Sequence, residues 1–384
     1  MHLKRFSRDA KADPAVLVLN YGPVKRASHS LVPSDRPART PREIFAWLDS
    51  YVIGQTRAKR AVAIAAYNHQ KRCAQPKGRG KKLIRKSNLL LIGPTGCGKT
   101  HLARNLADCL QVPFTVVDAT EYTEAGYYGK DVEVMIAELL FKANHSLEDT
   151  QRGIVFLDEI DKIARRSQGA RNGAGSRDIG GEGVQQAMLK LLEGREIFVP
   201  LNVTQHWNKH DFVQVDTSDI LFIAAGTFSD LPARADDKKI GFDESANGAR
   251  KTRRRRIGQK ELIEYGMLAE LLGRLPVVVE LDALDEEQLL EVLTGPPDSL
   301  VREYTALLQL DDVKLDFEDE ALRRVVRYAT SRRIGARGLR AILEEVCADV
   351  MFEAPERRGE TVVVSDRYVR ERLEALDEVS LGEG

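Results

Sequence analysis

A glycine-rich turn near the start of the second quarter of the chain carries the residue types that bind a nucleoside triphosphate. Gly93, Gly98, Lys99 and Thr100 fit the pattern G-x-x-x-x-G-K-[ST]. In this pattern the glycines let backbone N–H groups converge on phosphate oxygens, the lysine neutralises the outer phosphates, and the threonine hydroxyl can bind Mg²⁺. The alternative is an ordinary glycine turn before a helix. The residues between these, whose backbone completes the predicted loop, are Pro94, Thr95, Gly96 and Cys97.

Two adjacent carboxylates supply the second half of the predicted site. The stretch GIVFLDEID places the apolar residues 154–157 directly before Asp158 and Glu159. A carboxylate at the exit of a buried strand beside a phosphate loop can reach the metal ion, so Asp158 and Thr100 are the predicted Mg²⁺-binding residues. Glu159 can orient and polarise a water molecule for attack on the γ-phosphate. Without a phosphate loop the pair would be a solvated strand end. With one, it predicts ATP hydrolysis.

The elements that must position these residues alternate between strand and helix patterns. LLLIG precedes the loop, and HLARNLADCL follows it with apolar residues at helical spacing. Such alternation is typical of a parallel sheet with helices on both faces. We therefore predict an α/β fold in which the sheet is flanked by helices. The remaining runs in this pattern are PFTVVDA, DVEVMIAELLF, GIVFLDE, VQQAMLKLLEG and DILFIAAG.

The organisation of the chain predicts three parts. Residues 1–39 mix basic residues, prolines and serines without a sustained period, which indicates a flexible N-terminal arm. Residues 40–281 begin with helical patterns and continue into the alternating segment, as expected for a large α/β domain. Residues 282–384 are mainly helical, with the two short β runs VKLDF and TVVVS, and predict a smaller C-terminal domain.

Composition excludes several classes of protein. Acidic and basic side chains number 58 each, so no overall charge favours a nucleic-acid or membrane partner. The four cysteines form no C-x-x-C pair, so neither a structural zinc site nor a secreted disulfide framework is expected. The N-terminal stretch lacks the apolar core of a signal peptide, and no window approaches a membrane span of about 20 apolar residues. A soluble protein of the reducing cytoplasm is expected.

Seven segments in order resemble the ClpX family of AAA+ unfoldases, which feed the ClpP peptidase. The likeness runs from about Thr40 almost to the C-terminus. It implies an ATPase that unfolds and translocates proteins as a homohexamer and is not itself a peptidase, with ATP and Mg²⁺ as ligands. The related HslU carries a long insertion after the carboxylate strand, for which this chain has no room. The segments are TPREIFAWLDSYVIGQ, LLLIGPTGCGKT, GIVFLDEIDKIARR, GEGVQQAMLKLLEG, QVDTSDILFIAAG, LLGRLPVVVEL and RRIGARGLRAILEE.

The resemblance implies four further residues at the nucleotide. The segment VIGQ, Val52 to Gln55, matches the family segment that packs beside the adenine, with Val52 and Ile53 as the candidate contacts, although a helix entry turn around Gly54 is equally compatible. Arg274 in LLGRLP matches the arginine finger that a subunit supplies to its neighbour's nucleotide, where a guanidinium stabilises developing charge. Arg337 in GARGLR matches the arginine by which the small domain senses the nucleotide. Taken without the family, Arg274 would be part of a surface ion pair, and Arg337 would cap a helix or lie on a solvated face.

The resemblance also assigns contacts with other proteins. Tyr127 and Tyr128 in EAGYYGKDV match the pore loop whose aromatic ring grips the translocating polypeptide, and Arg177 lies in a segment that matches a second pore loop. Buried turn tyrosines are the alternative for the first pair. Ile240, Gly241 and Phe242 match the tripeptide that docks on ClpP, and a loop folded onto its own domain is the alternative.

The chain departs from the family pattern in two places. Residues 1–39 contain no cysteine, so the family's N-terminal zinc module is not expected here. Where the family has an R-K-H pore-entrance loop, this chain places Gln205, His206 and Trp207. Recognition of the family's usual C-terminal degradation tag therefore does not follow from the resemblance.

Two other functions remain open at this point. The chain could be a ring chaperone that remodels protein complexes without a peptidase. It could also be a nucleic-acid-remodelling ATPase, because ARKTRRRRIG places six basic residues in one short stretch at 249–258. Such runs are more often solvated linkers, and no aromatic platform for bases accompanies this one. Nucleic acid is therefore not the expected partner.

Overall fold

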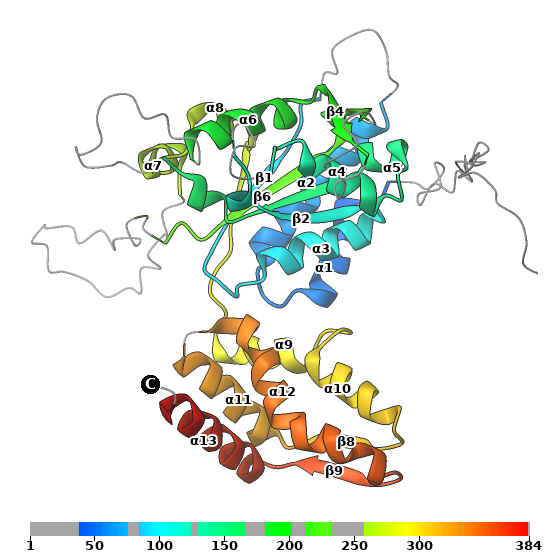
Figure 1. Ribbon diagram of the computed structural model, residues 1–384, viewed down its shortest axis with the longest axis vertical. Coiled ribbons are helices and arrows are strands. Elements are labelled where there is room, and N and C mark those ends of the chain that lie inside the picture. The colour runs from blue at the N-terminus through cyan, green and yellow to red at the C-terminus, as the bar shows by residue number, and fades with distance from the viewer. Residues whose placement is uncertain are drawn as a thin grey trace, which may run out of the picture.

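The computed structural model describes residues 38–75, 84–123, 130–165, 181–201, 212–229, 231, 257–332 and 334–382 (Figure 1). The α-helices are α1 (Pro41–Tyr51), α2 (Thr56–Cys73), α3 (Lys99–Leu110), α4 (Val134–Lys142), α5 (Leu147–Gln151), α6 (Glu182–Glu193), α7 (Gln259–Tyr265), α8 (Ala269–Arg274), α9 (Glu286–Thr294), α10 (Leu300–Gln309), α11 (Asp319–Ser331), α12 (Gly335–Glu353) and α13 (Asp366–Gly382). The strands are β1 (Leu89–Ile92), β2 (Phe114–Asp118), β3 (Ile154–Asp158), β4 (Glu196–Pro200), β5 (Phe212–Asp216), β6 (Leu221–Gly226), β7 (Val277–Glu280), β8 (Lys314–Phe317) and β9 (Thr361–Val364).

A parallel sheet with the order β2-β3-β6-β1-β7 forms the centre of the larger part of the molecule. Asp118 at the end of β2 pairs with Asp158 at the end of β3, and Ile92 at the end of β1 pairs with Gly226 at the end of β6. The carboxyl ends of these strands therefore lie along one edge of the sheet. In open parallel sheets this edge is where ligands bind.

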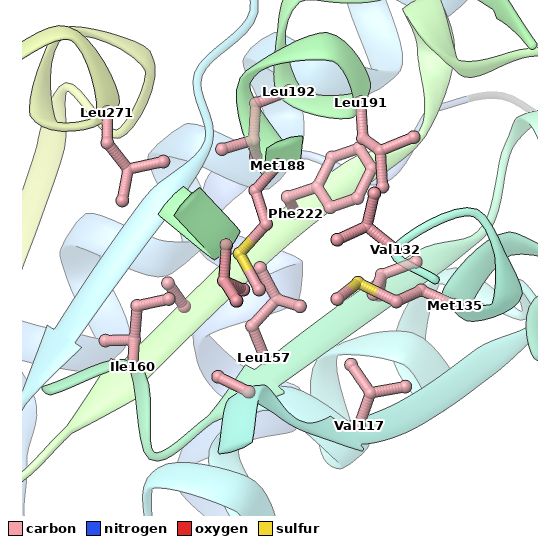
Figure 2. Packing of buried hydrophobic residues seen from close by; sticks show 14 of the residues in the cluster. Val117, Val132, Met135, Leu157, Ile160, Met188, Leu191, Leu192, Phe222 and Leu271 are labelled. Atoms are coloured by element: carbon pink, nitrogen blue, oxygen red, sulfur yellow. The ribbon is translucent and has the colours of Figure 1, made fainter. Parts of the chain in front are cut away.

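Both faces of the sheet are covered, which explains why its strands are almost continuously apolar. Successive residues of β1 alternate between two cores: Leu90 and Ile92 enter one, and Leu89 and Leu91 enter the other. Helices α4, α6 and α8 cover the first face, and α1, α2 and α3 cover the second. Figure 2 shows the first core, in which Met188 and Leu191 from α6 approach Leu157 of β3 and Phe222 of β6.

The chain leaves the sheet after β7 and continues into a second, mainly helical part with its own core (Figure 1). Helices α9 to α13 pack around residues such as Leu293, Val326 and Leu343, all of which are buried. The short strands β8 and β9 pair in parallel with Leu315 opposite Val362. Each part thus has a hydrophobic core of its own, which is the physical basis on which 40–281 and 282–384 are proposed as two domains.

The predicted α/β fold is confirmed, including the helices on both faces of the sheet and the helical C-terminal part. The antiparallel pair β4–β5 did not appear in the sequence analysis. Buried and exposed side chains alternate along these strands, but the exposed positions include the apolar residues Phe198 and Phe212. The sequence therefore lacks the apolar–polar alternation that would have identified the strands. The proposed arm lies outside the described residues, except for its last two positions.

Candidate nucleotide-binding site

The predicted phosphate loop joins β1 to α3 at the ligand-binding edge of the sheet. Gly98 has a φ of +93° and is the N-cap of α3, yet it supplies no side chain to cap the helix. The first N–H groups of this 12-residue helix therefore remain oriented toward the loop. A β-carbon at Gly98 would meet nothing within 4 Å, so glycine is needed there for the left-handed backbone and not for space. This arrangement is suited to an anion.

Lys99 lies within the loop, where its ammonium group meets backbone oxygens. The Nζ atom donates to the carbonyls of Gly93 at 2.7 Å and Pro94 at 3.0 Å, and the residue is buried. Thr100 follows with its Oγ1 atom 3.5 Å from Oδ2 of Asp158. Mg²⁺ binds oxygen ligands such as hydroxyl and carboxylate groups, and these two oxygens are close enough to share one ion. Thr100 and Asp158 therefore fit Mg²⁺.

The two predicted carboxylates have different surroundings. Asp158 ends β3, and its Oδ1 atom accepts a hydrogen bond of 2.9 Å from the backbone N–H of Glu159. Glu159 is exposed and has a φ of +54°, in the left-handed region that side chains rarely adopt. Such strain at a non-glycine residue is typical of functional sites. The conformation turns the chain between β3 and the following short helix, so that both carboxylates line the same cleft.

A second pair at this edge was missed by the sequence analysis. Thr227, directly after β6, donates from Oγ1 to Oδ2 of Asp161 over 2.8 Å, and the N–H of Phe228 donates to the same oxygen over 3.1 Å. Asp161 is buried, and both Asp161 and Thr227 line the cleft. The signal that could have found Thr227 is its position at the carboxyl end of a central strand, beside the phosphate loop.

These residues surround one cleft of about 1430 Å³ between the two parts of the molecule. Val52 and Ile53, which follow α1, line it, as does every residue from Gly93 to Thr100. The small domain contributes Arg337 and Arg340 from α12. Arg340 is held by two hydrogen bonds to Glu303 of α10, at 2.8 and 2.6 Å, and these lower the pKa of Glu303. The cleft therefore collects nearly all the residues predicted to bind the nucleotide.

The phosphate loop and α12 also touch directly through their backbones. A β-carbon built on Gly96 would lie 3.2 Å from the backbone nitrogen of Ala336, and one built on Gly335 would lie 3.3 Å from the carbonyl oxygen of Thr95. Both glycines have positive φ angles, +77° and +60°. This contact brings the N-terminus of α12, and with it Arg337, against the loop.

Arg274 is not among the described residues that line this cleft. It is exposed at the end of α8, where its Nη2 atom is 2.9 Å from Oε1 of Glu193. Its backbone carbonyl accepts a 3.0 Å hydrogen bond from the buried Asn88, whose Oδ1 atom accepts from the N–H of Phe222. The Asn88 side chain therefore fixes the end of α8 against the sheet.

The remaining predicted contact residues lie outside the described part of the chain. These are Tyr127 and Tyr128 of the first pore segment, Arg177 of the second, the tripeptide Ile240, Gly241 and Phe242, and the pore-entrance residues Gln205, His206 and Trp207. The basic stretch at 250–256 also lies outside it.

Cys97 of the loop is enclosed by its neighbours. Burial raises the pKa of its thiol, and the nearby Lys99 opposes this effect. The thiol therefore stays protonated at neutral pH and is no nucleophile, in agreement with a role for this position through its backbone.

Within the described residues, no group of three or more His, Cys, Asp or Glu side chains could hold a metal ion. None of the described helices has the length and apolar character needed to cross a bilayer.

The fold and the cleft define an AAA-type P-loop ATPase. Residues 84–278 match the AAA domain (Cdc48 subfamily), and residues 284–364 match the C-terminal, D2-small domain of ClpB protein. The ATP-dependent Clp protease ATP-binding subunit ClpX 2 of Wolinella succinogenes is 44% identical, over 88% of this chain and 83% of that protein. The corresponding ClpX of Treponema denticola is 39% identical, over 88% and 84%. The chain belongs to the ClpX family.

Proposed function

We propose that this ATPase unfolds other proteins and threads them through a ring of its own copies. The observation that carries the proposal is the cleft itself, because the phosphate loop and α12 of the small domain both line it and touch each other at Gly96 and Gly335. A nucleotide held there would meet both domains. Its hydrolysis and release would then change the angle between them, and that change can do mechanical work.

The described residues take the following roles in hydrolysis. The N–H groups of the loop and the ammonium group of Lys99 bind the phosphates. Thr100 and Asp158 would hold Mg²⁺, which when bound supplies positive charge beside the phosphates. Glu159 orients the attacking water and accepts its proton, since its exposed carboxylate lines the same cleft. Val52 and Ile53 pack beside the adenine, and their position in the lining of the same cleft supports this role.

Arg274 acts on the nucleotide of a neighbouring copy. Its side chain is exposed and away from the cleft of its own chain, which supports action in trans. A guanidinium there would stabilise the charge that develops on the γ-phosphate. Arg337, on α12, instead reads the nucleotide of its own subunit. This division of roles requires a closed ring, and the family resemblance favours a homohexamer.

The names of the two relatives, subunits of an ATP-dependent Clp protease, support ClpP as the partner. We assign docking on it to Ile240, Gly241 and Phe242, and gripping of the client polypeptide to Tyr127, Tyr128 and Arg177. A cytoplasmic location fits four cysteines that form no disulfide bond with one another in the structure. Folded domains are stable by about 5–15 kcal/mol, so unfolding by pulling calls for repeated ATP-driven strokes.

One set of assays tests this function against its rivals. ATPase activity is measured alone, with an unfolded protein and with duplex DNA, and client degradation is measured with and without ClpP. The proposal expects stimulation by unfolded protein and degradation only when ClpP is present. Unfolding without any degradation would favour the peptidase-independent chaperone. Stimulation by DNA alone would overturn both.

A further inference from the structure

The segment that joins α1 to α2 holds the linker between the two domains through one side chain. The Nε2 atom of Gln55 donates to the backbone carbonyl of Asp282 over 2.7 Å, and the N–H of Asp282 donates back to Oε1 of Gln55 over 3.0 Å. Asp282 follows β7 by two residues and begins the path to α9. A primary amide that pairs with both polar groups of one backbone residue fixes that residue in position and orientation.

The same amide also reaches the phosphate loop. Its Nε2 atom lies 3.5 Å from the carbonyl oxygen of Cys97, so both amide hydrogens are directed at backbone acceptors. The linker meets the loop directly as well, because a β-carbon on Gly93 would lie 2.8 Å from the carbonyl oxygen of Leu281. Gln55 therefore lies at a junction of the loop and the linker, 227 positions from Asp282 in the sequence.

The neighbouring residue, Gly54, lies close against the far end of the linker. A β-carbon on Gly54 would lie 2.8 Å from Nε2 of Gln288. Gln288 belongs to the first turn of α9, where it and Asp285 form a capping box. Gly54 and Gln55 thus contact the linker at its start and at its end in the small domain.

The backbone of Gln55 is strained, so its position has a cost in conformational free energy. Gln55 is the N-cap of α2, but its side chain makes no capping hydrogen bond, and its φ is +53°. Ser, Thr, Asp or Asn would ordinarily cap the helix here. Side chains held in the left-handed region cost of order 1–3 kcal/mol and persist where surrounding contacts over-determine them. The contacts that over-determine Gln55 are those to Asp282 and Cys97.

We propose that Gln55 is a positioning residue that ties the interdomain linker to the phosphate loop, so that a change at the nucleotide is passed to the small domain through Asp282. Gln55 does not line the cleft, so it acts on the nucleotide only through Cys97 and Asp282. The inference rests on the proposed function, because it assumes that the domain angle does work on a client.

The test compares the full-length chain with Q55M, which keeps the length of the side chain and removes the amide. Hydrogen exchange in the peptide that spans 281–289 reports on the linker, and Mg-ATP binding, ATP turnover and unfolding of a fluorescent client report on coupling. Q309L, at an exposed position at the end of α10, is the control. If Q55M fails to fold, Q55E, which keeps an acceptor for the N–H of Asp282, is measured in its place.

The expected result is linker exchange about fivefold faster in Q55M, because the N–H of Asp282 loses its acceptor and a hydrogen bond contributes about 1 kcal/mol. Mg-ATP binding should stay within about threefold, while client unfolded per ATP hydrolysed falls about fivefold or more. Wild-type exchange and coupling in Q55M would overturn the role. So would loss of Mg-ATP binding, since Gln55 would then belong to the nucleotide site itself. A wild-type chain that hydrolyses ATP without unfolding clients would instead count against the proposed function.

Discussion

Arg274 and Glu193 form an ion pair over 2.9 Å at the end of α8, away from the cleft of their own subunit. Glu193 also accepts from Arg195 at 2.6 Å. Partial burial of Glu193 raises the pKa of its carboxyl group, but the two guanidinium groups lower this pKa by more. Glu193 therefore stays ionised at neutral pH. An exposed pair of this kind contributes little to stability, at most about 1 kcal/mol. Little free energy is therefore lost if Arg274 leaves Glu193, as its proposed action on a neighbouring copy requires.

Replacement of Arg274 should separate binding from hydrolysis. We expect R274A to bind Mg-ATP normally and to lose at least about a hundredfold in turnover, because an arginine finger stabilises the transition state and not the bound substrate. The matched control is R195A, which removes the other arginine on Glu193. Equal turnover in R274A and R195A would contradict the role in trans.

Thr227 should matter through its hydroxyl group, which Asp161 holds in place. We expect T227V to reduce ATP turnover about tenfold, because it removes the hydrogen bond that holds the buried carboxylate of Asp161 beside the cleft, and the loss of such a bond costs about 1 kcal/mol or more. T227S keeps the hydroxyl and should restore most of the activity. Steady-state kinetics of the two variants check this prediction. Equal loss in both would contradict the prediction, because T227S keeps the hydroxyl group and should then keep most of the activity.

The contact between Gly335 and the phosphate loop gives a matched pair of glycine variants. Gly335 and Gly359 have φ angles of +60° and +81°, so alanine at either position strains the backbone, by about 1 kcal/mol. Only at Gly335 would the added methyl group meet the loop, at the carbonyl of Thr95. We therefore expect G335A and G359A to be destabilised similarly in thermal unfolding, and only G335A to lose client-stimulated ATPase activity. Similar activity in both would contradict a role for the contact.

The sequence was sufficient to predict that Lys99, Thr100, Asp158 and Glu159 share one site, because they belong to two recognisable motifs, and all four line the same cleft. It was not sufficient for the residues whose partners are remote in the chain. Nothing near Gln55 in the sequence indicates that its amide pairs with Asp282, and nothing near Thr227 indicates Asp161. Asp161 and Thr227 meet because the parallel sheet brings the ends of β3 and β6 to one edge, and Gln55 meets Asp282 because the segment between α1 and α2 lies beside the chain that follows β7.

The sequence also could not predict the strands β4 and β5. Periodicity identifies a strand when one face is apolar and the other polar, and Phe198 and Phe212 break that pattern by placing aromatic rings on the exposed face. The parallel strands of the central sheet were predictable for a different reason. Both of their faces are buried, so each appears as a short apolar run bounded by turn residues.

Lys86 makes the stability of the large domain depend on pH. Burial, helped by the charge of Arg72, lowers the pKa of its ammonium group to about 7, against the opposing effects of Asp216 and Asp219. The unfolded chain holds the same proton up to about pH 10.4. Between these values the unfolded state binds more protons, so this group makes stability rise with pH, by at most about 1.4 kcal/mol per unit.

Urea unfolding of K86M between pH 6 and pH 9 measures this effect. The free energy of unfolding of the wild type, measured relative to that of K86M, should increase as the pH rises above about 7. K190M, at an exposed position on α6, should stay parallel to the wild type throughout. Parallel curves for K86M and the wild type would show that Lys86 keeps an ordinary pKa in the folded chain.

Unfolding of a fluorescent client by the wild type and by E159Q is the most direct test of whether ATP hydrolysis at this cleft drives work on other proteins. Clients with different unstructured tails are used, and both forms are first shown to bind Mg-ATP. We predict that the wild type abolishes client fluorescence in an ATP-dependent manner, and that E159Q turns over ATP at least about a hundredfold more slowly and leaves the client folded. A wild type that hydrolyses ATP yet unfolds no client, or an E159Q that unfolds clients at the wild-type rate, would contradict the account.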